Sequence, residues 1–456
     1  MSFVVSTLFV FTVVAALLTN RDLLSPAKFY LFSFFVFHVG AVGTSHATEV
    51  WLLILLVVLV GAIAVLFEAL NVRRARTLLT AAPETVSFRM GLPAEPAHVF
   101  VFLWLLSLPA LLAQIYVVEL FGGLEGYVGI LANRVIEWRG MGVSRTLIGT
   151  LATLDLVYLA LGLTRPRSPA WWTVYAFHFF CVLVIGLLSG SRSGILNVLG
   201  LQVFIYHYIR RPVKLRMVVL MAAALVCAGL VLGVVREGFR IDDGEFSMGL
   251  SDAEQVLSVP TLNYGVTPLE ILADAASLKL AYGSTLVSLL TNAVPRDWWP
   301  EKPDTGGVFF TKQYTGDEWD GASNLTPTLL GEFVVNFGWV AGTVTYLIAY
   351  PLLMYAVVRQ YRRTRSRLRR CRDGVAAIDL VVYLLWMWSV VALMTGEVTN
   401  VLLTFMLTGL IPAVLARGLI ARLMHRRTLR RVSGPRSAEI GLSRAAGYRK
   451  TLSDLR

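Results

Sequence analysis

The sequence is short of charge, cysteine and recognisable cofactor motifs, and each shortage excludes a class of protein. Only 15% of the residues are charged and 56% are hydrophobic, whereas soluble domains are about a quarter charged, so an ordinary soluble protein is excluded. The three cysteines, Cys181, Cys227 and Cys371, lie in two apolar runs and one basic loop, which excludes a disulfide framework. No closely spaced histidines or cysteines, no Asp-x-Asp pair and no glycine-rich phosphate loop occur. We therefore expect neither a metal ion nor any other cofactor.

Long apolar runs dominate the chain instead. A helix needs about 20 mostly apolar residues to cross the hydrocarbon layer of a bilayer. We predict an all-α polytopic membrane protein with about 11 transmembrane helices and one large extracytoplasmic loop. The predicted spans are residues 2–19, 27–45, 50–70, 97–119, 145–163, 170–188, 194–209, 215–235, 328–357, 376–395 and 400–421.

Lysine and arginine collect in alternate loops, which predicts the orientation. The cytoplasmic set contains Arg21 and Lys28, residues 73–89, 165–167 and 210–216, eight arginines between Arg359 and Arg372, and the tail after Arg417. The outer set is 46–49, 120–144, 189–193, 236–327 and 396–399. The N-terminus is then periplasmic and the C-terminus cytoplasmic, and we interpret the net charge of +12 as a topology signal facing membrane lipids, not nucleic acid.

Four regions follow from this pattern. They are helices 1–8 in residues 1–235, a large periplasmic loop at 236–327, helices 9–11 at 328–421 and a basic cytoplasmic tail at 422–456. The loop holds fourteen acidic residues against six basic ones, a net of −8. Apolar spacing within 252–290 predicts amphipathic helix, whereas 291–327 is rich in Pro, Gly and Trp and predicts irregular loop.

Four outer segments together resemble the bacterial Wzy-type oligosaccharide repeat-unit polymerases. They are Phe121-Gly122-Gly123 with Tyr127 and Arg134, then 189–194 (Ser-Gly-Ser-Arg-Ser-Gly), then 294–303 (Val-Pro-Arg-Asp-Trp-Trp-Pro-Glu-Lys-Pro), and the re-entry at 331–338 (Gly-Glu-Phe-Val-Val-Asn-Phe-Gly). In sequence the resemblance covers about 190–340, and in topology most of the chain. It implies a GT-C-like membrane glycosyltransferase of the bacterial inner membrane. Such an enzyme polymerises repeat units linked to undecaprenyl diphosphate on the periplasmic side and releases the polyprenyl diphosphate, as in O-antigen synthesis during cell envelope biogenesis.

Fixed cations suit this chemistry because negative charge builds up on the leaving diphosphate. Arginine binds phosphate oxygens in pairs and stays charged in a low dielectric. We expect Arg192, Arg240 and Arg296 to be catalytic. The alternative is that each is a solvated or snorkelling arginine, or pairs with acids of the outer loop. The expected substrate-binding residues are Arg134, Arg236, Lys302, Tyr314 and Asn336.

The acceptor hydroxyl must lose a proton, and a general base assists that step. No histidine occurs between residues 208 and 424, so a carboxylate is the expected base. Glu332 at the outer mouth of a span is the first candidate, although it is also explained as an acid favoured by a helix N-terminus. Asp242, Asp243, Glu245 and Glu397 are alternatives.

The donor and acceptor glycans on their lipid carriers are the expected partners, with a chain-length regulator and a flippase as further partners of the resembled family. Two other functions stay open. An O-antigen ligase shares the many spans and the basic outer loop. A transporter or flippase is less favoured, because Asp155 is the clearest mid-span acid and has no counterpart in a second half.

Overall fold

The computed structural model describes the membrane part of the chain almost throughout. The described residues are 1–43, 46–80, 99–130, 137–138, 140–189, 192–224, 227, 239–242, 245–248, 264–292, 294, 298–316, 324–371 and 373–432. Three predicted site residues, Arg134, Arg236 and Arg296, lie outside them, as do Asp243 and much of the predicted eighth span.

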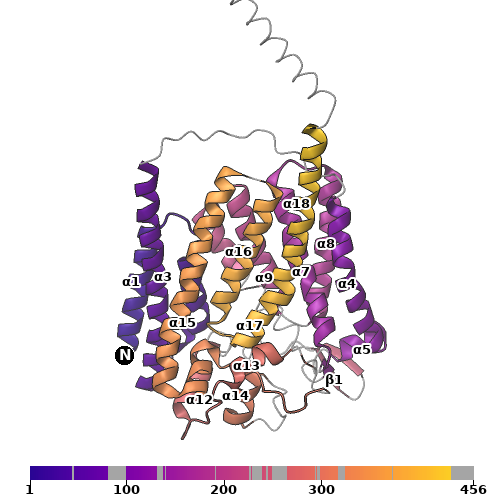
Figure 1. Cartoon of the computed structure of the whole chain (residues 1–456). Helices are drawn as coiled ribbons and strands as arrows, with labels where there is room; N and C mark the ends of the chain where they lie inside the picture. The colour runs from indigo at the N-terminus through magenta and orange to yellow at the C-terminus, as the bar shows by residue number, and fades with distance from the viewer. Residues whose placement is uncertain are drawn as a thin grey trace, which may run out of the picture.

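Within these residues, eight helices are long and apolar enough to cross a membrane. The protein is therefore a helical, polytopic membrane protein (Figure 1). The eight are α1 (Ser2–Thr19), α3 (Thr48–Thr80), α4 (Val99–Leu120), α7 (Gly142–Thr164), α8 (Pro169–Leu188), α15 (Thr328–Arg370), α16 (Gly374–Ala392), and the continuous series α17 (Val398–Thr404), the π-helix η3 (Phe405–Leu410) and α18 (Ile411–Val432).

Three shorter apolar helices fall on the other predicted spans. These are α2 (Pro26–His38), α9 (Arg192–Ile209) and an apolar helix at Leu215–Ala224. The run 27–45 does not form one helix, because α2 ends at His38 and a 3-10 turn, η1 (Val39–Gly43), follows. At 1.5 Å per residue, the 13 residues of α2 cover about 20 Å, less than the hydrocarbon thickness of about 30 Å.

Local signals in the sequence explain where several helices begin. Proline occupies the first turn of α2 and α8, where its missing N–H costs nothing. The Asp373 carboxylate accepts a hydrogen bond from the Ala376 N–H at 2.7 Å and caps the start of α16. Burial of apolar side chains holds the helices together. Helix α16 buries one face in the bundle, whereas Phe3, Phe11 and Leu18 of α1 are largely exposed, as on a lipid-facing helix.

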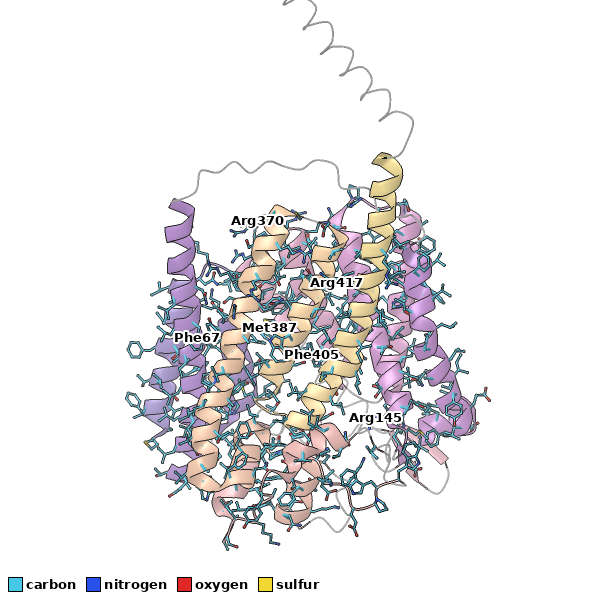
Figure 2. The ribbon with its side chains drawn as sticks, viewed as in Figure 1. Phe67, Arg145, Arg370, Met387, Phe405 and Arg417 are labelled. Atoms are coloured by element: carbon cyan, nitrogen blue, oxygen red, sulfur yellow. The ribbon has the colours of Figure 1, made fainter. Side chains whose placement is uncertain are left out.

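The described parts of the two predicted sets of loops lie at opposite ends of the bundle. At the lower end in Figure 1, the Tyr127 hydroxyl of α5 (Gly123–Gly129) donates to the Leu188 carbonyl, and the Gly265 N–H donates to the Phe37 carbonyl. At the upper end, Asp22 lies 3.3 Å from Arg365, and Arg417 bonds Asp379. Arg370 and Arg417 lie toward this end in Figure 2, which we call the basic end.

The large loop contains more regular structure than expected. Helices α12 (Thr267–Asp274) and α13 (Ser284–Thr291) fall within the predicted amphipathic stretch. The prediction of irregular loop for 291–327 is wrong for α14 (Gly306–Tyr314), because Phe310 and Thr311 are buried against neighbouring helices and packing overrides the weak local propensity.

The same loop also contains a short antiparallel ribbon that the sequence analysis did not indicate. Its two strands are β1 (Phe239–Asp242) and β2 (Glu245–Met248), and Asp242 pairs with Glu245 at the closed end. The two residues between the strands are Asp and Gly in the sequence, a pair typical of hairpin connections. The ribbon is a small addition to an otherwise helical architecture.

Helix α15 is broken near its start. Gly338 has φ 80° and ψ 174°, a backbone conformation that essentially only glycine adopts. The break separates residues 328–337, which belong to the lower end, from the long apolar segment that follows. The predicted single span at 328–357 is therefore divided at Gly338, and residues 331–337 lie in a short helix before the break.

Candidate active site

A layer of short helices closes the lower end of the bundle. It consists of residues 264–292 and 298–316, with α12, α13 and α14, and we call it the cap (Figure 1). The cap contacts the first turns of α15 and α17, and the Ala281 N–H donates to the Val335 carbonyl at 2.9 Å. Polar side chains at this junction form the candidate site.

Glu332 is at the centre of the junction. Its side chain is fully buried. One carboxylate oxygen accepts from the Thr285 hydroxyl of α13 at 3.0 Å, and the other accepts from the Val398 N–H of α17 at 2.7 Å. The free N–H groups of a helix N-terminus favour an anion. Glu332 accepts from such an N–H at the start of α17, and not from the first turn of its own helix.

Asn336 lies one turn further along α15 and completes the same network. Its amide nitrogen donates to the Thr285 hydroxyl and to the Glu332 carbonyl, both at 2.7 Å, and its amide oxygen accepts from the Gly283 N–H at 2.8 Å. Thr399 of α17 donates to the Thr285 carbonyl at 3.2 Å. Three helices that are distant in sequence are thereby joined through one buried threonine.

A second buried carboxylate, Glu397, lies directly before α17. It accepts a hydrogen bond from the Gly307 N–H at the start of α14 and another from Thr305. Burial raises the pKa of Glu397 above its ordinary value, and the two hydrogen bonds only partly oppose this. The glycines at the start of α14 allow the close approach of these side chains, because a β-carbon on Gly306 would lie 2.7 Å from Glu332 and one on Gly307 would displace the Asn324 side chain.

Two strained backbone positions lie at the junction between the cap and α15. Among the described residues, the non-glycine positions with positive φ are Tyr282, at 49°, and Thr328, at 63°. Tyr282 precedes the Gly283 N–H that binds Asn336, and the Thr328 hydroxyl accepts from the Gly331 N–H at 3.2 Å. Such strain costs on the order of 1–3 kcal/mol per residue and persists where the surroundings over-determine the backbone.

Two of the predicted arginines lie in described elements at the same end. Arg192 is the first residue of α9, and Arg240 lies in β1. Helix α9 begins where α8 ends, next to the α5 contact with Leu188. The start of α9 and the cap therefore belong to one end of the molecule, as the predicted topology requires.

Two predicted substrate ligands make contacts within the cap. The Lys302 ammonium donates to the carbonyls of Asn292, at 3.3 Å, and Val294, at 2.6 Å. The Tyr314 hydroxyl accepts from the Lys279 N–H and donates to the Lys279 carbonyl, both at 2.9 Å. These contacts hold the cap together, and substrate binding by either residue stays a prediction.

The arrangement sets a condition on proton transfer. Each oxygen of Glu332 accepts one hydrogen bond and keeps a further lone pair. The side chain is fully buried, so a sugar hydroxyl can reach the carboxylate only if a neighbouring element moves. Thr285 of α13 contacts one oxygen, whereas the Val398 N–H is fixed in α17, so a base role for Glu332 requires the cap to shift at α13, as in active sites that close on their substrate.

A further polar chain, which the sequence did not predict beyond Asp155, lies buried between four helices. The Asp155 carboxylate of α7 lies 3.0 Å from His178 of α8, and the other ring nitrogen of His178 lies 2.9 Å from the Ser107 hydroxyl of α4. Gln202 of α9 donates to Asp155 at 3.0 Å. The order resembles a Ser-His-Asp triad, but Ser107 also donates to the Leu103 carbonyl of its own helix and is fully buried. The chain ties helices together instead of presenting a nucleophile.

A corresponding cluster forms at the basic end. Asp22, between α1 and α2, accepts hydrogen bonds from Tyr361, at 2.6 Å, and from His207, at 2.9 Å, and lies 3.3 Å from Arg365. In the sequence, only the turn-like composition of residues 20–25 indicates that Asp22 lies between two helices. The partners come from α9 and α15, which only the folded bundle brings together.

Neither a protein-family model, nor a curated protein, nor a solved structure matches this chain. A proposal of function for this chain therefore depends on the geometry of the candidate site and on the resemblance of the outer segments to the polymerases named above.

Proposed function

We propose that the protein is a membrane glycosyltransferase that polymerises oligosaccharide repeat units carried on polyprenyl diphosphate. It acts on the outer side of a bacterial inner membrane, breaks the bond between the anomeric carbon and the diphosphate, and releases polyprenyl diphosphate. The proposal includes the eleven-span topology with a periplasmic N-terminus and a cytoplasmic C-terminus.

One observation supports this proposal most directly. The re-entrant first turns of α15, which carry Glu332 and Asn336, meet the cap at the same end as the start of α9, where Arg192 lies. These belong to segments that resemble the polymerases. A lipid-linked substrate has its diphosphate at the membrane surface, so a cap at the ends of membrane helices is suitably located to receive it.

In the proposed mechanism, the arginines and the carboxylate have separate roles. Arg192, Arg240 and Arg296 stabilise the charge that develops on the leaving diphosphate. Glu332 takes the proton of the attacking hydroxyl once a shift of α13 opens access to the buried carboxylate, and Glu397 holds the start of α14 in place. The donor and acceptor glycans are bound by a second set of polar residues, Arg134, Arg236, Lys302, Tyr314 and Asn336. A chain-length regulator and a flippase are the proposed protein partners.

The test is a reconstitution of purified protein with a synthetic polyprenyl-diphosphate repeat unit as the only substrate. A ladder of products that persists in the presence of a chelator is expected for a metal-independent polymerase. Consumption of substrate only after a second lipid acceptor is added would identify a ligase instead.

One observation favours a transporter as the second candidate. The Asp155–His178 pair is fully buried within the predicted membrane part, and such pairs occur in proton-coupled carriers. Movement of a labelled lipid-linked oligosaccharide across vesicles without any change in its mass would support that function and contradict the glycosyltransferase.

A further inference from the structure

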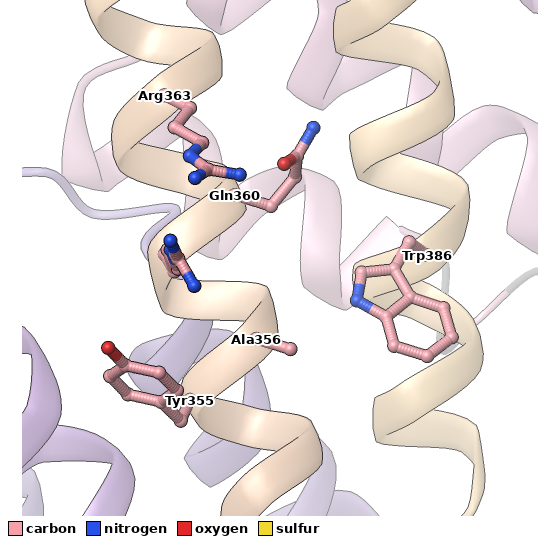
Figure 3. A pocket seen from close by; sticks show the side chains of 6 residues that line it. Tyr355, Ala356, Gln360, Arg363 and Trp386 are labelled. Carbon is pink, nitrogen blue, oxygen red and sulfur yellow. The ribbon is translucent and has the colours of Figure 1, made fainter.

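A groove opens between α15 and α16 near the basic end. Its volume is about 310 Å³, and it is lined by Tyr355, Ala356, Arg359, Gln360, Arg363 and Trp386. Figure 3 shows Arg363 and Gln360 on α15, and Trp386 lower in the view on the neighbouring helix α16. The groove is remote from the cap, so a ligand bound in it is independent of the proposed function.

The two arginines in the groove differ from their neighbours on α15. Arg362 donates to Asn71, Arg365 bonds Tyr361, and Arg367 bonds Asp379. Arg359 and Arg363, in contrast, have no hydrogen bond or ion pair to any part of the chain that the structure describes. They are one turn apart, which places their β-carbons about 6 Å from each other on one face of the helix.

The same face continues into the membrane as an apolar strip. Ile348 and Leu352 precede Arg359 at helical spacing, and their side chains are 57% and 61% exposed. Tyr355 is exposed between them and the arginines. A surface that is apolar along the span and doubly cationic at its end matches a molecule with acyl chains and an anionic head.

We propose that this groove binds a glycerophospholipid with a net negative headgroup, such as phosphatidylglycerol. The planar guanidinium groups of Arg359 and Arg363 bind the phosphodiester oxygens. The Trp386 indole of α16 forms the opposite wall and gives the acyl chains an apolar contact below the arginines. The acyl chains lie along Leu352 and Ile348. Basic pockets between membrane helices commonly bind anionic headgroups in this manner.

The test compares two double variants of the full-length protein with the same change in charge. Arg359→Gln/Arg363→Gln removes both cations from the groove. Arg369→Gln/Arg370→Gln removes two exposed arginines of the same helix that do not line it. Binding of phosphatidylglycerol and phosphatidylcholine to each purified protein in detergent is measured by native mass spectrometry, and the melting temperature without added lipid verifies folding.

The expected result is that the groove variant binds phosphatidylglycerol about tenfold more weakly than the wild-type protein, while the control variant is unchanged and phosphatidylcholine is affected in neither. An equal loss in both variants would show attraction to overall surface charge and would overturn the proposal. Displacement of phosphatidylglycerol by an equal concentration of inorganic phosphate would assign the groove to a free anion, and would also overturn it.

Discussion

The Glu332 carboxylate of α15 accepts a hydrogen bond from the Val398 N–H of α17 at 2.7 Å, across 66 residues of sequence. Its other oxygen accepts from Thr285 of the cap. One buried side chain thus joins two membrane helices and the layer that covers them, so a substitution at this position affects all three.

Replacing Glu332 by glutamine should remove the base and keep most of the packing. An amide oxygen can still accept from Val398, so the melting temperature should change little. Polymer formation should fall at least about 100-fold, the usual contribution of general-base catalysis. The reconstitution assay measures this, and Glu301→Gln, at an exposed position of the same end, serves as the control. A normal product ladder from Glu332→Gln would reject the base assignment.

Arg192→Ala should lower turnover by roughly 100-fold or more, since the loss of one charge-stabilising donor typically costs that much. Arg192→Lys should restore only part of the rate, because an ammonium lacks the paired geometry for phosphate oxygens. Arg145→Ala, which removes another arginine near that end that stacks over Trp138, should leave turnover within a few fold. Equal losses from the two alanine variants would point to a general charge effect.

His178→Ala should destabilise the bundle strongly. It leaves one oxygen of the buried Asp155 unpaired while Gln202 still contacts the other, and breaking a buried pair costs about 3–5 kcal/mol. Removing both side chains together should cost less than the sum of the two single changes, because no unpaired charge remains. Thermal unfolding in detergent measures this, with Thr173→Ala on the exposed face of α8 as the control. Additive effects would show that the pair is not coupled.

Stability should depend on pH through Glu397. Its pKa is raised by burial in the folded protein, so the folded state binds a proton more readily than the unfolded state. Stability is then greatest below the ordinary value of 4.5 and falls as the pH rises from there through the raised pKa. Glu397→Gln should flatten this part of the profile, and Glu49→Gln, at an exposed position, should not. Identical slopes for wild-type protein and Glu397→Gln would contradict the prediction.

Asp22 should make the stability of the folded protein fall as the pH is lowered, opposite to the effect of Glu397. Burial favours a higher pKa, but hydrogen bonds from His207 and Tyr361 and the charge of Arg365 outweigh it and lower the pKa of Asp22 to about 2. Its contribution, roughly 2 kcal/mol, is complete above 3.8 and is lost as the pH falls through 2. Unfolding followed across this pH range measures the loss. Asp22→Asn should lack it, and Asp274→Asn, at the exposed end of α12, should retain it.

The long helices could be predicted because hydrophobic run length is a local property. The predicted spans 2–19 and 170–188 match α1 and α8 within a residue. Predictions were weaker where tertiary packing determines whether a helix forms and where it ends. Helix α14 forms in a Pro- and Gly-rich stretch because Phe310 is buried there, and α2 is shorter than its apolar run because the chain turns at Val39.

The sequence indicated single candidate residues of the site but not which residues contact one another. Glu332 was identified from its position at the mouth of a span, and its complete burial was not foreseen. Thr285 lies 47 residues before it, and nothing in the local sequence marks that threonine as a partner. Likewise, the partnership of Asp155 with His178 depends on how α7 and α8 rotate against each other. Pairings of this kind follow from tertiary geometry, which periodicity does not specify.

The contacts of the cap also determine when it can form during synthesis. Gly307 binds Glu397, which follows it by 90 residues. A ribosome adds about 5–20 residues per second, so the cap waits on the order of 10 s for its last partner. During that interval the start of α14 lacks the carboxylate that binds it. The completion of the cap is therefore coupled to the synthesis of the last helices of the bundle.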